Sequence, residues 1–212
     1  MPDTEPRTHE FKAEIKQLLD ILIHSIYTSK DVFVRELISN AADALEKVRF
    51  KKASGEEILA KDLPLEIQIE TNKDDRILVI SDTGIGMSEA EVEDNIGTIA
   101  HSGATAFLEQ LKQEKETQAG EAEAEDSTGV NLIGRFGVGF YSVFMAAEKV
   151  VLTSRSADAN ASPIVWTSSG TGSYTLETAP EETPRGTKIE IHLKREEDQF
   201  ADDAEIKRII QR

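Results

Sequence analysis

Apolar residues recur at helical spacing in two stretches near the start of the chain. Residues 12–26 carry apolar side chains three or four positions apart, and so do residues 31–52, which follow Ser29. This spacing places apolar side chains on one face of an α-helix, and Ser and Asp commonly begin helices. The pattern therefore predicts two amphipathic helices, the second capped near Ser29 or Asp31.

Alternating and continuous apolar runs predict strands further along. Residues 65–70 alternate between apolar and polar, whereas residues 77–80 are apolar on both faces, which is typical of a strand inside a sheet. A polar turn at 72–75 separates these runs and favours an antiparallel hairpin. Four more strands are predicted, at residues 149–154, 163–167, 172–176 and 187–193.

The order of elements predicts an α+β fold. Shorter helices are expected at residues 88–99, 103–112, 140–147 and 206–210. Residues 113–129 are rich in Glu, Ala, Gln and Gly, which predicts a mobile loop that is either a functional lid or plain disorder. Helices gather early in the chain and strands late, so we expect helices over one face of a largely antiparallel sheet.

Composition narrows the classes of partner. The 212 residues carry a net charge of −16, which argues against nucleic acid and anionic membranes as main partners. The chain has no cysteine, and therefore neither disulfides nor thiolate chemistry. The first ten residues contain no apolar signal segment, and no run is long enough to span a membrane, so we expect a cytoplasmic location.

The second predicted helix carries a polar stripe opposite its apolar face. Glu36, Asn40, Asp43 and Lys47 fall on this side. A solvated helix face is the ordinary interpretation, but Asn and Asp are poor helix formers in mid-helix. An amide oxygen is a suitable Mg²⁺ ligand, and a carboxylate one turn away is placed to activate a water molecule. Both interpretations stay open on this pattern alone.

Asp82 ends the most apolar predicted strand and is followed by Gly84 and Gly86. A carboxylate at the end of a buried strand is costly unless hydrogen-bond donors surround it, and glycines let the backbone approach a ligand closely. Such a carboxylate suits a ligand with a fixed amino group, such as adenine. A plain turn is the alternative.

A second glycine cluster precedes the helix predicted at 140–147. Gly134, Gly137 and Gly139 free the backbone N–H groups at a helix start, which is the arrangement of an anion site. The spacing matches neither a Rossmann fingerprint nor a Walker A loop. A flexible connector is the alternative.

Together these motifs resemble an ATP-binding superfamily, often called GHKL, shared by type II topoisomerases, MutL mismatch-repair proteins, histidine kinases and heat-shock protein 90 chaperones. The spelling narrows the resemblance to the N-terminal ATPase domain of the heat-shock protein 90 family, over nearly the whole chain. The stretches that carry it are FVRELISNAADAL (33–45), SDTGIGM (81–87), NIGTIA (95–100) and IGRFGVGFYS (133–142), with Gly186-Thr187. Compactness and acidity favour the bacterial form.

The resemblance implies a two-layer Bergerat fold, a ligand set of ATP or ADP with Mg²⁺, and roles for individual residues. Glu36 would be the general base, Asn40 would bind Mg²⁺, and Asp82 would accept the adenine amino group with Thr187 helping through water. Residues 1–212 would be a single N-terminal nucleotide-binding domain, without middle and C-terminal domains, and with a lid at about 97–139. The other implied nucleotide contacts are Asp43, Ala44, Gly86, Met87, Asn95, His101, Gly137, Val138, Gly139 and Phe140.

Two features depart from the family pattern. His101 stands where Lys or Arg is usual, and a mostly neutral imidazole would contact phosphate more weakly at neutral pH. Residues 114–126 form a longer acidic insertion than expected, which either slows lid closure or is an inert solvated loop.

The function implied is that of a molecular chaperone acting on unfolded client proteins. ATP–Mg²⁺ binding would close the lid and promote N-terminal dimerisation, and the segment near Phe11 would form a strand that pairs or swaps between protomers. The full-length protein would be a homodimer, and the isolated domain a monomer with weak ATPase activity, because the family supplies an arginine from the middle domain. The alternatives are a topoisomerase or MutL module, a nucleotide sensor without catalysis, and an acidic interaction domain without a ligand.

Overall fold

A computed structural model describes residues 6–10, 29–97 and 139–211. The helices predicted at 12–26 and 103–112 and the loop predicted at 113–129 lie outside the described residues. No helix in the described part of the chain is both long and apolar enough to cross a membrane.

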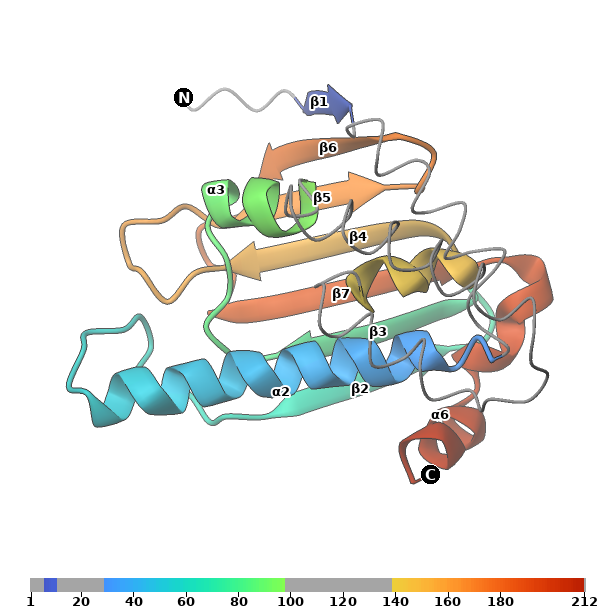
Figure 1. Ribbon diagram of the computed structural model, residues 1–212, viewed down its shortest axis with the longest axis horizontal. Coiled ribbons are helices and arrows are strands. Elements are labelled where there is room, and N and C mark those ends of the chain that lie inside the picture. Colours follow the sequence, from blue (N-terminus) through green and yellow to red (C-terminus); the bar gives the residue numbers. More distant parts are fainter. Residues whose placement is uncertain (1–5, 11–28, 98–138, 212) are drawn as a thin grey trace, which may run out of the picture.

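The described residues form a seven-stranded sheet in which every pairing is antiparallel (Figure 1). The strand order is β1-β6-β5-β4-β7-β3-β2, so the predicted hairpin of β2 and β3 is confirmed and β3 lies inside the sheet. The strands are β1 (Arg7–Glu10), β2 (Ile67–Asn72), β3 (Ile77–Asp82), β4 (Ala147–Arg155), β5 (Ile164–Ser168), β6 (Ser173–Thr178) and β7 (Gly186–Leu193).

Helical segments lie over one face of this sheet, which confirms the predicted two-layer α+β fold. Figure 1 shows α2, α3 and η3 on the same side, while η4 and α6 close the end near the C-terminus. The helical segments are α2 (Val32–Ala53), α3 (Glu89–Val92), η2 (Glu93–Gly97), η3 (Gly139–Met145), η4 (Arg195–Ala201) and α6 (Asp203–Ile210).

The core fills the space between the two layers. Phe33 and Leu37 on the apolar face of α2 are buried together with Leu78 and Ile80 of β3, and Trp166 of β5 belongs to the same cluster. Burying a side chain of this size contributes roughly 1.5–3 kcal/mol to stability. The apolar face of α2 packs against the sheet, which fixes the rotation of the helix about its own axis. Its polar stripe therefore has a fixed position as well.

Three local predictions are corrected. Asp31 stands at the start of α2 but makes no capping hydrogen bond with its side chain, because it pairs with Arg35 one turn later at 2.7 Å. The helix predicted at 88–99 is a four-residue α-helix, begun by a capping box of Ser88 and Glu91, that widens into the π-helix η2. The helix predicted at 140–147 is the 3₁₀-helix η3, and β4 begins directly after it.

Candidate functional site

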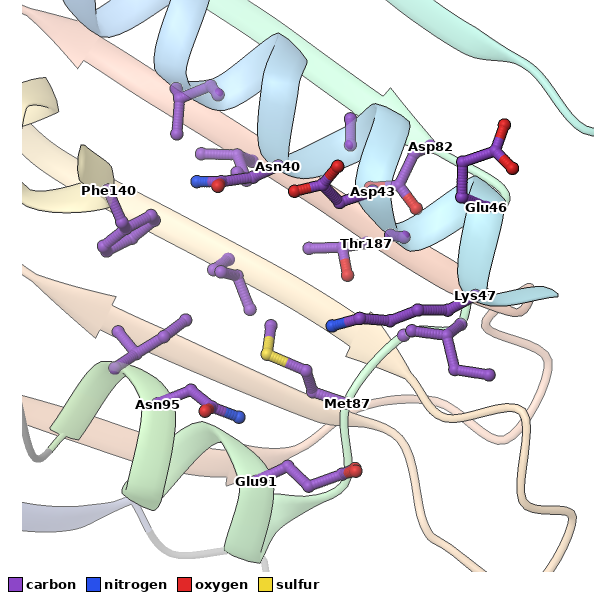
Figure 2. A pocket seen from close by; sticks show the side chains of 18 of the residues that line it. Asn40, Asp43, Glu46, Lys47, Asp82, Met87, Glu91, Asn95, Phe140 and Thr187 are labelled. Atoms are coloured by element: carbon purple, nitrogen blue, oxygen red, sulfur yellow. The ribbon is translucent and has the colours of Figure 1, made fainter. Parts of the chain in front are cut away.

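A cavity of about 1060 Å³ opens between the two layers. Figure 2 shows α2 along one side and the α3–η2 segment along the other, with the ends of β3, β4 and β7 beneath. Apolar side chains cover much of its floor, and polar side chains reach it from both sides. Cavities that are mostly apolar and have a few placed polar groups are typical of sites for small organic ligands. The apolar floor includes Ile80, Leu152 and Ile189, with Met87 and Phe140 beside it.

Asp82 lies at the bottom of this cavity, at the end of β3. Its carboxylate accepts a hydrogen bond from the Gly84 backbone N–H at 2.7 Å. Burial raises the pKa of Asp82 to about 6, while the backbone amides of Gly84 and Thr187 and the charge of Arg185 act in the opposite direction. The carboxylate is therefore an acceptor held in a largely dry site and ionised at neutral pH.

Ser154 connects the three segments that meet around Asp82. Its hydroxyl accepts from the Met87 backbone N–H at 2.9 Å, and it lies 3.0 Å from the Thr187 hydroxyl and 3.1 Å from the Gly186 carbonyl oxygen. Ser154 is fully buried in β4, directly opposite Thr187 in the strand pairing. This network fixes the positions of Met87 and Thr187 at the cavity wall.

Glycine at two positions allows backbones to cross closely here. Gly86 has φ +60°, and a Cβ on it would overlap the carbonyl oxygen of Arg155. Gly186 has φ +123°, and a Cβ on it would overlap the backbone carbonyl of Asp82. A side chain at either position would meet rigid backbone as well as an unfavourable φ. The Asp-x-Gly-x-Gly segment is therefore more than a surface turn.

The polar stripe of α2 provides the opposite wall. Asn40 and Asp43 line the cavity, and Lys47 extends over it toward Met87 (Figure 2). Glu36 lies one turn before Asn40 but does not line the cavity as the described residues form it. Its half-buried carboxylate lies against Gly139, where a Cβ would overlap Oε2. Burial raises the pKa of Glu36 above its ordinary value.

The structure brings most of the residues singled out from the sequence to one cavity. Glu36 and Gly139 contact each other beside it. His101, Gly137 and Val138 lie outside the described residues. The predicted residues that line the cavity are Asn40, Asp43, Ala44, Asp82, Gly86, Met87, Asn95, Phe140 and Thr187.

Several residues of the site were not assigned from the sequence. Ser154 follows an ordinary strand pattern, and only its pairing with Thr187 marks it as part of the site. Glu91 and Phe50 line the outer part of the cavity, and Phe50 is 71% exposed. Arg185 directly precedes the Gly186-Thr187 motif, and this position was the only feature of the sequence that could have pointed to Arg185.

The donor set limits how a metal ion can be held. Among the described residues, no group of three or more His, Cys, Asp or Glu side chains is arranged to hold a metal ion. The Asn40 amide is a hard oxygen ligand at the cavity wall. Mg²⁺ commonly takes one or two protein ligands and completes its shell with phosphate oxygens and water, so this donor set fits a Mg²⁺ that arrives with a nucleotide.

The chain is similar in sequence to a family of ATPases and to several chaperone proteins. The profile of the "Histidine kinase-, DNA gyrase B-, and HSP90-like ATPase" family matches residues 27–181. The chain is 51% identical over 203 residues to "Chaperone protein HtpG" of Desulfitobacterium hafniense, covering 96% of this chain and 31% of that protein. A protein of the same name in Oleidesulfovibrio alaskensis is 48% identical, with 96% and 30% covered.

A further protein named "Chaperone protein HtpG", from Pectobacterium atrosepticum, is 47% identical over 204 residues, with 96% of this chain and 31% of that protein covered. The chain thus spans about a third of the length of the curated relatives it matches. The family profile covers most of the chain, including the polar stripe of α2 and the Asp82 junction. The chain belongs to the family of histidine kinase-, DNA gyrase B- and HSP90-like ATPases.

Proposed function

We propose that the chain is the nucleotide-binding part of an ATP-hydrolysing molecular chaperone. The observation that carries the proposal is the half-buried Asp82 carboxylate at the end of a mostly apolar cavity. An ionised carboxylate only accepts hydrogen bonds, so it selects a ligand that presents a donor. The 6-amino group of adenine is such a donor, whereas guanine presents a carbonyl oxygen at the same position.

The two walls of the cavity determine where the rest of the nucleotide lies in this proposal. With adenine at Asp82, the base lies on the apolar floor near Met87 and Ile189, and Thr187 assists at its edge. The ribose and phosphates then extend along α2 past Asn40 toward Glu36 and the start of η3. The backbone amides of Gly137, Val138, Gly139 and Phe140, with His101, complete the phosphate contacts in this proposal.

Glu36 is the general base of the proposed hydrolysis. Its pKa is raised by burial, and a base whose pKa approaches the working pH accepts a proton more effectively. The carboxylate takes a proton from a water molecule that attacks the γ-phosphorus in line with the leaving ADP oxygen. Asn40 would hold Mg²⁺, and that ion would offset the negative charge of the phosphate oxygens.

The wider role follows the printed name of the relatives, which are chaperone proteins. In this proposal, residues 97–139 act as a lid that closes over ATP, and closure promotes pairing of N-terminal domains in a homodimer that acts on client proteins in the cytoplasm. The isolated domain binds nucleotide as a monomer and hydrolyses it weakly. These properties are proposed for a protein of the length of these relatives, of which the chain spans about a third.

Thermal unfolding with different nucleotides tests the proposal. We expect ADP with Mg²⁺ to raise the melting temperature in a concentration-dependent way, because a ligand that binds only the folded state stabilises it by RT ln(1 + [L]/Kd). GDP at the same concentration is the matched control and should give no shift. Equal shifts with ADP and GDP would contradict the adenine assignment, and no shift with ADP would contradict nucleotide binding.

A further inference from the structure

Arg185 is a buried cation whose burial is not explained by a hydrogen-bonded partner. The residue is 1% exposed, and Nε and both terminal nitrogens of its guanidinium lack a hydrogen-bond partner among the described residues. Burial lowers the pKa of Arg185 from its ordinary value. A buried charge without hydrogen bonds is costly to a fold, and an apolar side chain of similar volume is often tolerated better. The position of Arg185 therefore calls for a role other than stability.

The backbone places Arg185 next to the purine end of the cavity. Arg185 directly precedes Gly186, whose Cα packs against the backbone carbonyl of Asp82. Thr187 follows and pairs with Asp82 across β7 and β3. The two charges act on each other: Arg185 favours the ionised carboxylate, and Asp82 favours the charged guanidinium.

Other charged side chains near Asp82 are less suited to this role. On β7, Lys188 is exposed, and its Nζ lies 3.7 Å from Oε2 of Glu190. On β4, the Arg155 guanidinium donates to the Glu181 carboxylate at 3.2 Å. The other charged side chains that line the cavity are Lys51, which is half-buried and donates to Glu56 at 2.6 Å, and a group of exposed side chains: Asp43, Glu46, Lys47, Glu56 and Glu91. Arg185 is the buried cation of the set.

We propose that Arg185 is a positioning residue for nucleotide recognition, whose buried positive charge holds the Asp82 carboxylate in the ionised form that accepts the adenine amino group. The inference rests on the proposed function and deepens it. A protonated Asp82 would present an O–H donor to the amino group and lose that hydrogen bond. Burying Arg185 then lowers the stability of the empty domain, whereas the ionised Asp82 that it favours strengthens ligand binding.

Two measurements on the same variants test the proposal. The first is a carbon-13 NMR titration of the Asp82 carboxyl in the ligand-free domain, and the second is calorimetric binding of ADP from about pH 5.5 to 8.5. The variants are Arg185→Met, which removes the charge, and Arg185→Lys, which keeps it. Arg155→Met is the matched control, because it removes an arginine of the same sheet end whose guanidinium is paired with Glu181.

We expect the Asp82 midpoint of Arg185→Met to rise by up to about one pH unit, because Arg185 is the smallest of the three influences that favour the ionised carboxylate, after the backbone amides of Gly84 and Thr187. The ADP dissociation constant should then rise by up to about threefold near pH 6.5 and stay unchanged near pH 8.5. Arg185→Lys and Arg155→Met should keep the wild-type midpoint, and Arg185→Met should melt no lower than the wild type. ADP ionises identically in every titration, so its own protonation cancels in the comparison.

An unchanged Asp82 midpoint in Arg185→Met would overturn the proposal, and so would a loss of affinity that is equal at every pH, because a merely structural role predicts that result. If Arg185→Met loses the native circular dichroism spectrum, Arg185→Gln makes the same comparison. A shifted midpoint in a domain that binds no ADP at any pH would contradict the proposed function while leaving the coupling between Arg185 and Asp82 intact.

Discussion

The two ends of the proposed nucleotide site hold their carboxylates in different ways, with Asp82 inside the cavity and Glu36 beside it. At the purine end, Asp82 is fixed by backbone: it ends a central strand, accepts from the Gly84 N–H, and lies where Gly86 and Gly186 let three segments cross. At the other end, Glu36 projects from α2 against Gly139, at the border of the described residues.

This difference indicates that ligand recognition and hydrolysis depend on different parts of the site and can be changed separately. A carboxylate fixed by crossing backbones has one position and suits the recognition of a rigid base. A carboxylate on a helix, packed against a glycine, is positioned by that packing and can be moved without disturbing the sheet. We therefore expect changes at the purine end to alter binding and changes at the other end to alter turnover.

The largest expected effect is at Glu36. Glu36→Gln keeps the size of the side chain but removes its basicity, so turnover in the full-length protein should fall by about 10²–10⁴-fold while ADP affinity changes little. A steady-state ATPase assay with parallel ADP calorimetry measures both quantities. Glu70→Gln, at an exposed position on β2, is the control and should behave as the wild type. An unchanged rate in Glu36→Gln would rule out the general-base role.

The second effect is at Asp82 and affects binding. Asp82→Asn replaces two acceptor oxygens with one oxygen and one NH₂ group. If the oxygen keeps the hydrogen bond from the Gly84 N–H, the NH₂ group meets the adenine amino group, so ADP affinity should fall by about 10²-fold or more. The same change removes a buried charge, so the empty domain should melt no lower than the wild type near pH 7. Calorimetry and thermal unfolding check the two parts. Wild-type affinity in Asp82→Asn would contradict the assignment of the purine end.

Two glycine substitutions compare the rigidity of the two ends. Gly86→Ala combines φ +60° with an overlap against the Arg155 backbone, so it should lower stability by about 1–3 kcal/mol and weaken ADP binding. Gly139→Ala meets the end of the flexible Glu36 side chain, so it should cost little stability but reduce turnover about tenfold by displacing the carboxylate. Urea unfolding and ATPase assays separate the two. Equal stability losses would remove the contrast between the ends.

The last expected effect is a pH dependence that runs in opposite directions for stability and binding. The pKa of Asp82 is raised from 3.8 to about 6 by burial, so between these values the native state binds more protons than the unfolded state. Stability of the empty domain should therefore fall as pH rises through this window, by on the order of 2–3 kcal/mol. ADP affinity should instead fall as pH drops below about 6, because the protonated acid is a poorer acceptor.

Urea unfolding and ADP calorimetry at matched pH values measure these two trends. Asp82→Asn, which has no group to titrate at this position, is the control and should lose both contributions. If stability and affinity were to rise together with pH in the wild type, Asp82 would not be the group responsible.

Much of this arrangement could be predicted from local patterns. The apolar period of α2, the alternation of β2 and β7, and the run of Ile and Val in β3 are determined by side chains a few positions apart, and they gave the correct layers. The polar stripe of α2 was visible for the same reason, since residues one turn apart share a helix face. Asp82 was visible because a carboxylate at the end of an apolar run is unusual.

Features that depend on strand register could not be predicted in this way. Ser154 becomes part of the site only because β4 and β7 pair in the register that sets it opposite Thr187. Arg185 follows the polar segment 181–184, where an exposed side chain is the ordinary expectation, yet it is 1% exposed. The 3₁₀ form of η3 was missed because the apolar spacing of residues 140–147 does not distinguish it from an α-helix; in η3 the Ser142 hydroxyl donates to the Gly139 carbonyl.

A crystal structure of the domain with ADP and Mg²⁺ tests the central claim most directly. The account predicts the adenine amino group at hydrogen-bond distance from the Asp82 carboxylate, about 2.7–3.2 Å, with the phosphates directed along α2 toward Asn40 and Glu36. A nucleotide in the reverse orientation, with its base near Phe50 and its amino group away from Asp82, would contradict it.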